Sequence, residues 1–277
     1  MAYTTFDFSI TDQVAHIRFN RPDKRNAMNR AFWEEIRQVF AVEIGQRRAD
    51  VRVAVISSTG PHFTAGMDLS VFTDIVADKG DPARRRESFR RGLLGYQESF
   101  NVIEACRVPV LAAIQGGCIG GGVDMVSACD MRYCTADAFF VIKEIDLGMV
   151  ADVGTLQRLP HLIPQGLVRE LAYTGRSLPA AEALRCGLVN RVHETQAAML
   201  DDVLGIARDI AAKSPLAIYG SKEMINYARD HTVDEALSYM SVWNAAFIHG
   251  DDMPEAMRAT QEKRRPAFKD LVLDSKS

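Results

Sequence analysis

Two stretches near the N-terminus alternate between apolar and polar side chains. In residues 6–10 and 15–19 every second residue is apolar, which is the period of a β-strand with one buried face. The two stretches together predict a β-hairpin. Residues 51–56 are apolar throughout except for Arg52, which is the pattern of a strand buried on both faces.

Helical periodicity begins after Asn29, a residue type that caps helices, and continues to about residue 46. It returns over about residues 70–106, where residues 77–87 form a charged and looser piece whose arginines are expected to face solvent. Further strands are expected at 131–134, 139–142 and 188–192, and short helices at 154–160, 164–174 and 179–186.

From about residue 195 onward every segment has a helical pattern. Strands thus alternate with helices in the first part of the chain, and only helices follow. This order predicts an α/β fold with a mostly parallel sheet. We divide the chain into a core of residues 1–195 and a helical region of residues 196–277.

Composition and charge narrow the class of protein. The 277 residues are 47% hydrophobic and 25% charged, as in a globular protein with a sizeable core. The net charge of −3 does not favour nucleic acid or a membrane surface as a partner, and no apolar run reaches the length of a membrane span. Five cysteines without a C-x-x-C pair predict reduced thiols and no zinc site. No secretory signal pattern is present, so we expect a cytoplasmic location.

Residues 115–124 are the most informative stretch, because five of the ten are glycine. An apolar run at residues 108–114 leads into this glycine turn and a helical pattern leads out of it. Glycine permits close backbone approach and positive φ. A helix N-terminus also presents unpaired N–H groups to whatever lies in front of it. The glycine turn is therefore predicted to hold a negatively charged oxygen.

Other glycine-rich motifs do not fit this turn. Dinucleotide-binding spacing from Gly120 requires a glycine where Met125 stands. A phosphate-binding P-loop requires Lys and Ser or Thr where Gly122 and Val123 stand. The nucleophile elbow is absent, and the zinc-protease motif fails because residue 197 is alanine. Binding of an oxyanion by backbone N–H groups remains.

Residues 63–69, 116–124 and 140–148 together resemble the crotonase (enoyl-CoA hydratase/isomerase) superfamily. Residues 20–28 and 262–268 are also typical of that superfamily, so the resemblance covers nearly the whole chain. It implies a crotonase-type spiral of ββα turns with a C-terminal helical region that covers the site and makes trimer contacts. It further implies an acyl-CoA substrate, no separate cofactor or metal, and a homo-oligomer, either a trimer or a hexamer.

The same resemblance implies that the backbone N–H groups of Met67 and Gly121 hold the thioester oxygen. Such preorganised donors stabilise the charge of an enolate, and a single donor is worth about 3–4 kcal/mol. Further residues implied in binding the substrate are Ala65, Gly66, Asp68, Leu69 and Gly122, with Arg25 and Lys263 for the phosphates of coenzyme A.

Three acids indicate the branch of the superfamily. Hydratases have Glu at the positions of Asp124 and Glu144, whereas here the first is Asp and a third acid, Asp152, follows on the next loop. With the sequence at 151–160, this set resembles the Δ3,5-Δ2,4-dienoyl-CoA isomerases. The resemblance implies Glu144 as the base at C2, Asp152 as the acid at C6, and Asp124 as their support. Burial beside other carboxylates is expected to raise the pKa of Asp152.

Two other functions remain open on the sequence. A hydratase would use Asp124 and Glu144 to handle water and would not need Asp152. A non-catalytic acyl-CoA-binding relative would lack an acid or have a disrupted glycine turn, and neither is seen. Taken singly, Asp124 also suits the N-terminus of its own helix and Asp152 suits a helix cap near Gly154. Asp146 is assigned a structural role.

Overall fold

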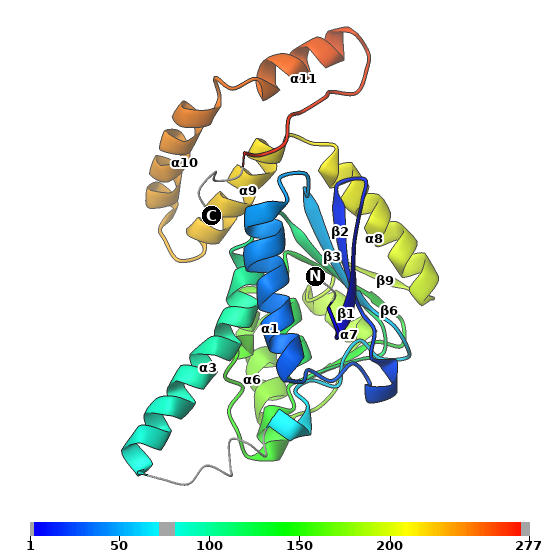
Figure 1. The fold of residues 1–277 in the computed structure, drawn as a ribbon, viewed down its shortest axis with the longest axis vertical. Coiled ribbons are helices and arrows are strands. Elements are labelled where there is room, and N and C mark those ends of the chain that lie inside the picture. The colour runs from blue at the N-terminus through cyan, green and yellow to red at the C-terminus, as the bar shows by residue number, and fades with distance from the viewer. Residues whose placement is uncertain (1–2, 72–80, 273–277) are drawn as a thin grey trace.

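A six-stranded sheet lies at the centre of the computed structural model, which describes residues 3–71 and 81–272 (Figure 1). Its strands, in spatial order, are β1 (Phe6–Thr11), β2 (Val14–Phe19), β3 (Val53–Ser58), β4 (Val110–Ile114), β6 (Met131–Thr135) and β9 (Arg191–His193). Only β1 and β2 pair antiparallel in this sheet, and every later pair is parallel. The predicted hairpin and the mostly parallel α/β sheet are confirmed.

A second, three-stranded sheet carries the glycine turn. It consists of β5 (Gly117–Ile119), β7 (Phe139–Val141) and β8 (Leu178–Pro179), with β7 in the middle. Strand β5 pairs parallel with β7, and β8 pairs antiparallel with β7. The chain then enters α4 (Gly121–Ser127) directly from β5 and the glycine that follows it. The predicted order of strand, glycine turn and helix is therefore confirmed.

Strand β3 is buried on both faces of the large sheet, as its continuous apolar run predicts. Val53 and Val55 belong to a cluster with Met199 and Val203 of α8 (Gln196–Ala211), which covers one face. Ile56 belongs to the larger core on the other face, beneath α1 (Arg30–Gln38) and α3 (Pro82–Glu104). Helix α8 thus packs directly on the sheet, and the division of the chain at residue 195 stays a prediction.

The first helix begins where the sequence predicts. The Asn29 side chain accepts a hydrogen bond from the Phe32 N–H at 3.0 Å and caps α1. Beyond α1 the helical chain continues as a π-helix over Val39–Arg47. Of the looser piece predicted at 77–87, residues 77–80 lie outside the described part of the chain. Residues 82–87 are not loose, because they form the first turns of α3, and their side chains are exposed.

Short helices follow the glycine turn as predicted: α5 (Thr155–Arg158), α6 (Gln165–Thr174) and α7 (Ala180–Cys186). The strand predicted at 188–192 is wrong in its start, because β9 begins at Arg191. Gly187 ends α7 with a φ of 85°, and the N–H of Leu188 then donates to the Ala183 carbonyl at 2.9 Å. The first residues of the apolar run therefore serve the helix end and not the sheet.

The C-terminal region is helical, as predicted. It contains α9 (Pro215–Ala228), α10 (Val233–Phe247) and α11 (Asp252–Gln261). Helix α9 lies against the core, where Lys222 Nζ donates to Asp130 Oδ2 at 2.8 Å, and α10 and α11 lie beyond it in the upper part of Figure 1. Helix α10 packs on α9 through an edge contact between Trp243 and Tyr219, with ring centroids 5.2 Å apart. The chain then returns to the core, where Arg52 Nε binds Asp270 Oδ1 at 2.9 Å. No helix within residues 3–71 and 81–272 is long and apolar enough to cross a membrane.

Candidate active site

A cavity of about 1090 Å³ lies where the 65–69 turn, the glycine turn and α3 meet. Its polar wall contains all three predicted acids, Asp124, Glu144 and Asp152. Its apolar wall consists largely of aromatic and aliphatic side chains, namely Trp33, Leu69, Phe89, Leu93, Tyr96 and Val153. An apolar chain with a polar reacting centre would fit such a lining.

The 65–69 turn is held in place by the loop at residues 25–28. The N–H of Met28 donates to the Gly66 carbonyl at 2.8 Å, and the N–H of Asp68 donates to the Met28 carbonyl at 3.0 Å. On the other side, the N–H of Ala65 donates to the Arg25 carbonyl at 2.9 Å. Ala65, Gly66, Asp68 and Leu69 all line the cavity, as the sequence predicts.

These bonds leave the Met67 N–H unused, and it lies close to that of Gly121. Neither N–H has a hydrogen-bond acceptor among the described residues. A Cβ atom added to Gly121 would lie 3.8 Å from the Met67 nitrogen, and one added to Gly66 would lie 3.5 Å from the Gly121 nitrogen. Both Met67 and Gly121 line the cavity. The two free donors can therefore bind one oxygen atom, which is the geometry predicted for an oxyanion site.

The remaining glycines of the turn are required by close packing. Gly120 has a φ of 51°, and a Cβ there would lie 3.0 Å from Glu144 Oε1. A Cβ on Gly122 would lie 2.5 Å from Thr64 Cγ2. Gly122 does not line the cavity, and its contact with the substrate stays a prediction. Its role here is to let α4 pack closely against Thr64.

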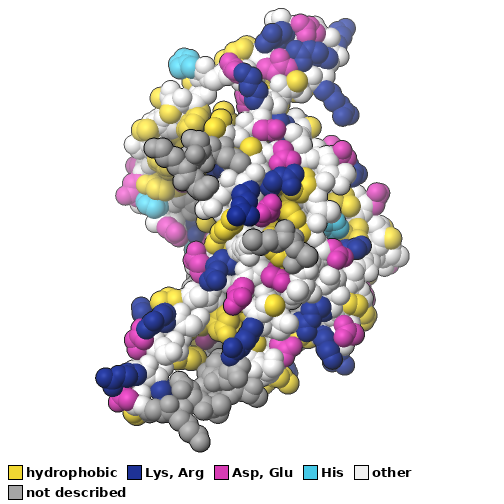
Figure 2. All heavy atoms as spheres, viewed as in Figure 1, with side chains coloured by type: hydrophobic (Ala, Val, Ile, Leu, Met, Phe, Trp, Pro, Cys, Tyr) yellow, Lys and Arg dark blue, Asp and Glu magenta, His cyan; other side chains and the backbone are white. Residues whose placement is uncertain are grey.

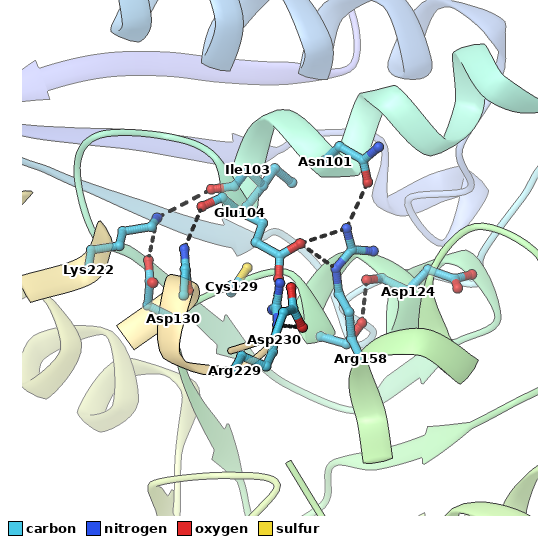
Figure 3. Close-up of polar contacts among 12 residues, drawn as sticks. Asn101, Ile103, Glu104, Asp124, Cys129, Asp130, Arg158, Lys222, Arg229 and Asp230 are labelled. Carbon is cyan, nitrogen blue, oxygen red and sulfur yellow. Dashed lines mark hydrogen bonds and ion pairs between the residues drawn. The ribbon is translucent and has the colours of Figure 1, made fainter. Parts of the chain in front are cut away.

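Asp124 is buried in α4, with only 1% of its surface exposed. Its Oδ1 accepts a hydrogen bond from the N–H of Thr155 at 2.6 Å, so it binds the start of α5 as well as facing the cavity (Figure 3). Burial raises the pKa of Asp124 to about 6, against the opposing effects of Thr155 and of the nearby Arg158 charge. The acid is thus partly protonated at neutral pH.

Glu144 also lines the cavity and lies at the start of a short 3-10 helix over Glu144–Leu147. Burial, followed by the charges of Asp124 and Asp152, raises the pKa of Glu144 to about 7. The backbone N–H groups of Glu144 and Lys143 lower it in part. A carboxyl with a pKa near 7 is well matched to accept a proton at neutral pH. Asp146 forms an ion pair with Lys143 at 2.6 Å, which agrees with the structural role assigned to it.

Asp152 is half-buried in the cavity wall, and burial raises the pKa of its carboxyl above the usual value. It does not cap α5, since the N-cap residue of that helix is Gly154 and the first N–H is bound by Asp124 instead. The Gln97 side chain donates to the Asp152 carbonyl at 2.7 Å and fixes the backbone at this point. The Asp152 side chain therefore remains available to the cavity.

The predicted phosphate contacts are not among the residues that line the cavity. Arg25 is exposed, adopts a left-handed backbone with a φ of 49°, and contributes its carbonyl to the 65–69 turn. Lys263 is also exposed, at the end of α11. Their contact with coenzyme A stays a prediction. The basic residues that do line the cavity are Lys24, Arg30, Arg85, Arg86 and Lys143.

Four residues that support the site were not predicted from the sequence. They are Met28, Gln97, Thr155 and Arg158, each of which acts on the site through a contact with a segment remote in the chain. Two signals are available: the alanine and methionine at 27–28 belong to a motif typical of the family, and Thr155 and Arg158 lie within residues 151–160, which carry part of the resemblance. The described residues contain no group of three or more His, Cys, Asp or Glu side chains that could hold a metal ion.

Known proteins resemble this chain in sequence and in fold. The model of the enoyl-CoA hydratase/isomerase family matches residues 9–271. The mitochondrial Delta(3,5)-Delta(2,4)-dienoyl-CoA isomerase of Mus musculus is 50% identical over 92% of this chain and 79% of its own. The peroxisomal Delta(3,5)-Delta(2,4)-dienoyl-CoA isomerase of Arabidopsis thaliana is 41% identical over 93% of each chain. An enoyl-CoA hydratase structure from Bacillus anthracis superposes with a TM-score of 0.86 at 29% identity, over 96% of this chain and 99% of that one.

Proposed function

The chain belongs to the enoyl-CoA hydratase/isomerase family, and from this premise we propose that it converts 3,5-dienoyl-CoA into 2,4-dienoyl-CoA. The observation that carries the proposal is the third acid: Asp152 faces the same cavity as Asp124 and Glu144, beside the free N–H pair. The dienoyl-CoA isomerases named above support it through their identity over most of the chain. Addition of water to an enoyl-CoA would not need Asp152.

The reaction moves two double bonds and leaves the atom count unchanged. Glu144 takes a proton from C2 of the thioester, and the electrons of that C–H bond spread over the diene and onto the thioester oxygen. The N–H groups of Met67 and Gly121 donate to this oxygen and stabilise its charge. Asp152 then gives a proton to C6, so that the double bonds lie at C2–C3 and C4–C5.

Two acids are needed because C2 and C6 are four bonds apart. At neutral pH the raised pKa values of Glu144 and Asp124, about 7 and 6, mean that the three carboxyls share protons among themselves. Protonation of one carboxyl is favoured by the negative charge of its neighbours. In the reactive state Glu144 is ionised and Asp152 carries a proton, and burial of the Asp152 carboxyl favours its protonated form. After each cycle Glu144 releases its proton to solvent and Asp152 takes one up from solvent.

The cavity lining suggests how the substrate lies. The acyl chain packs against Trp33, Phe89, Leu93 and Tyr96, whose side chains form the apolar wall. The phosphates of coenzyme A are attracted by the basic residues at the cavity rim, Lys24, Arg85, Arg86 and Lys143 among them. Arg85 and Arg86 belong to the projecting N-terminal half of α3 (Figure 1).

We also propose that the protein forms a homo-oligomer, a trimer or a hexamer. Large apolar side chains are exposed on α10 and just beyond it, and Figure 2 shows apolar surface in that area. They are Val233, Leu237, Val242, Phe247 and Ile248. A patch of this kind is typical of a protein–protein interface. Light scattering coupled to size-exclusion chromatography measures the mass directly, and a monomer would refute the proposal.

We propose separately that the protein resides in a reducing compartment. The five cysteines are free thiols, four of them buried, which suits a reducing compartment such as the cytoplasm. The Mus musculus and Arabidopsis thaliana relatives are named as mitochondrial and peroxisomal. Fluorescent tagging of the protein in its own cells distinguishes these locations.

A spectrophotometric comparison tests the function. The purified protein is mixed with a 3,5-dienoyl-CoA, and the rise in ultraviolet absorbance of the conjugated 2,4-diene is followed. A 2-enoyl-CoA of the same chain length is then offered, and loss of its absorbance is followed. We expect rapid conversion of the diene. Conversion of the 2-enoyl-CoA alone would identify a hydratase, and conversion of neither would favour a binding protein.

A further inference from the structure

The segment at residues 152–158, which carries Asp152 at its start, is tied to one side of α3. Gln97 donates from Nε2 to the Asp152 carbonyl at 2.7 Å. At the other end, Arg158 donates to Asn101 Oδ1 at 2.8 Å and to Glu104 Oε2 at 3.0 Å. Because the three α3 residues are spaced by four and then three positions, they lie on one face of that helix. The acid-bearing segment is thus fixed to the helix that also forms the apolar cavity wall.

Arg158 sits at the centre of this arrangement and is 9% exposed. Its guanidinium packs against the backbone of Gly154, where an added Cβ would lie 1.9 Å from the terminal nitrogen. Gly154 lies two residues after Asp152, and the next residue, Thr155, donates its N–H to Asp124. Arg158 therefore contacts the chain between Asp152 itself and Thr155, the residue that binds Asp124. It does not itself line the cavity.

A row of charges continues from Arg158 to the C-terminal helices (Figure 3). Glu104 accepts from Arg158 with one oxygen and from Arg229 with the other, and Arg229 lies 3.6 Å from Asp230. Arg229 directly follows α9. In this row each buried charge has a partner of opposite sign, so loss of one partner would leave a buried charge uncompensated. The C-terminal helices are thereby connected to the segment that holds Asp152.

We propose that Arg158 is a positioning residue for the acids. By bridging Asn101 and Glu104 it holds the 152–158 segment in the place that proton transfer requires, and Arg229 completes this anchor from the C-terminal helices. The proposal rests on the isomerase function, because it assigns Arg158 a part in that reaction. Arginine suits the task since its planar fork binds two partners at once, which lysine cannot do in the same way.

Steady-state kinetics of three variants tests the proposal with a 3,5-dienoyl-CoA. Arg158→Met keeps much of the side-chain volume but removes the charge and both contacts. We expect kcat to fall by about 10–100-fold with KM changed by less than about threefold, as misplaced catalytic groups lose rate and not binding. Arg158→Lys is expected to recover part of the rate. The matched control is Arg191→Met, which removes an exposed ion pair to Asp202 outside the cavity and should leave kcat unchanged.

A double variant separates positioning from general stability. If Arg158 acts through Asp152, adding Arg158→Met to Asp152→Asn costs little more rate than Asp152→Asn alone. Losses that multiply would overturn the proposal. So would a kcat within about twofold of the wild type in Arg158→Met with a lower melting temperature, since that pattern describes a structural residue.

A milder variant covers the case in which Arg158→Met does not fold. Asn101→Leu removes the acceptor of Arg158 and a long, exposed hydrogen bond to Glu98 but no charge, and we expect a kcat loss of about 3–10-fold with faster amide hydrogen exchange in residues 152–158. Unchanged exchange and rate would overturn the proposal. The exchange measurement needs no substrate. If the wild type fails to convert the diene, the isomerase function fails, while the exchange result still decides whether Arg158 and Asn101 anchor the segment.

Discussion

Replacing Asp124 by Asn should make the protein more stable at high pH, although it removes a group from the site. Asp124 is only 1% exposed, and burial raises its pKa from 3.8 to about 6. The difference of 2.2 units corresponds to about 3 kcal/mol at 1.36 kcal/mol per unit. This is the cost of holding the carboxylate charged in the folded state. Asparagine keeps the oxygen that accepts from the Thr155 N–H and carries no charge.

The sign of the effect depends on pH in a defined way. A raised pKa means that the folded state binds a proton more tightly than the unfolded state, so stability falls as pH rises. Above about pH 7 both states are ionised and the full cost applies. Below pH 3.8 both are protonated and the cost disappears. The advantage of Asp124→Asn should therefore be up to about 3 kcal/mol at pH 8 and about half of that at pH 5.

Urea unfolding at pH 8 and pH 5, at one fixed protein concentration, measures this advantage. Asp201→Asn on the exposed side of α8 is the control, since it removes a carboxylate from solvent and should change the free energy of unfolding little. The reasoning is refuted if Asp124→Asn is no more stable than the wild type at pH 8. It is also refuted if the difference between the two proteins does not shrink at pH 5.

The remaining predictions concern the reaction. Gly121→Val should lower kcat by at least about 100-fold, because its side chain would meet Met28 and displace an oxyanion donor. Met67→Ala should keep most of the activity. Initial rates with the diene compare the two variants. For the wild type, kcat/KM measured from pH 5 to 9 should fall about tenfold per unit below about pH 7, as Glu144 becomes protonated and loses its ability to act as a base, and a flat profile would contradict that role. Asp152→Asn should reduce isomerisation by about 10²–10⁴-fold, and full activity of that variant would show that another group protonates C6.

Much of the fold is set by local patterns that the sequence displays. The alternation in residues 6–10 and 15–19 is the hairpin, and Asn29 caps α1. The glycine turn was also predictable, because five glycines within residues 116–122 are a local pattern that permits close backbone approach and positive φ. The proposed function of that turn as an oxyanion site rests on its nearness to Met67, and the family motifs imply this pair.

Contacts between remote segments were not predictable in the same way. Gln97 reaches Asp152 and Arg158 reaches Glu104 across more than fifty residues, and the local sequence does not show which partner each contacts. The strand predicted from Leu188 begins later, since a left-handed glycine at 187 turns the first residues back onto α7. The Arg25 carbonyl accepts from the Ala65 N–H and supports the 65–69 turn, a contact that the local sequence does not indicate.

Isomerisation in heavy water tests the central claim most directly. The wild-type protein converts a 3,5-dienoyl-CoA in deuterated buffer, and the 2,4-dienoyl product is examined by mass spectrometry and NMR. Since Asp152 exchanges its proton with solvent while Glu144 keeps the one from C2, we predict one deuterium in each product molecule, located at C6. A product without deuterium would mean that one group carries the same proton from C2 to C6. A hydrated product, or none, would contradict the isomerase assignment itself.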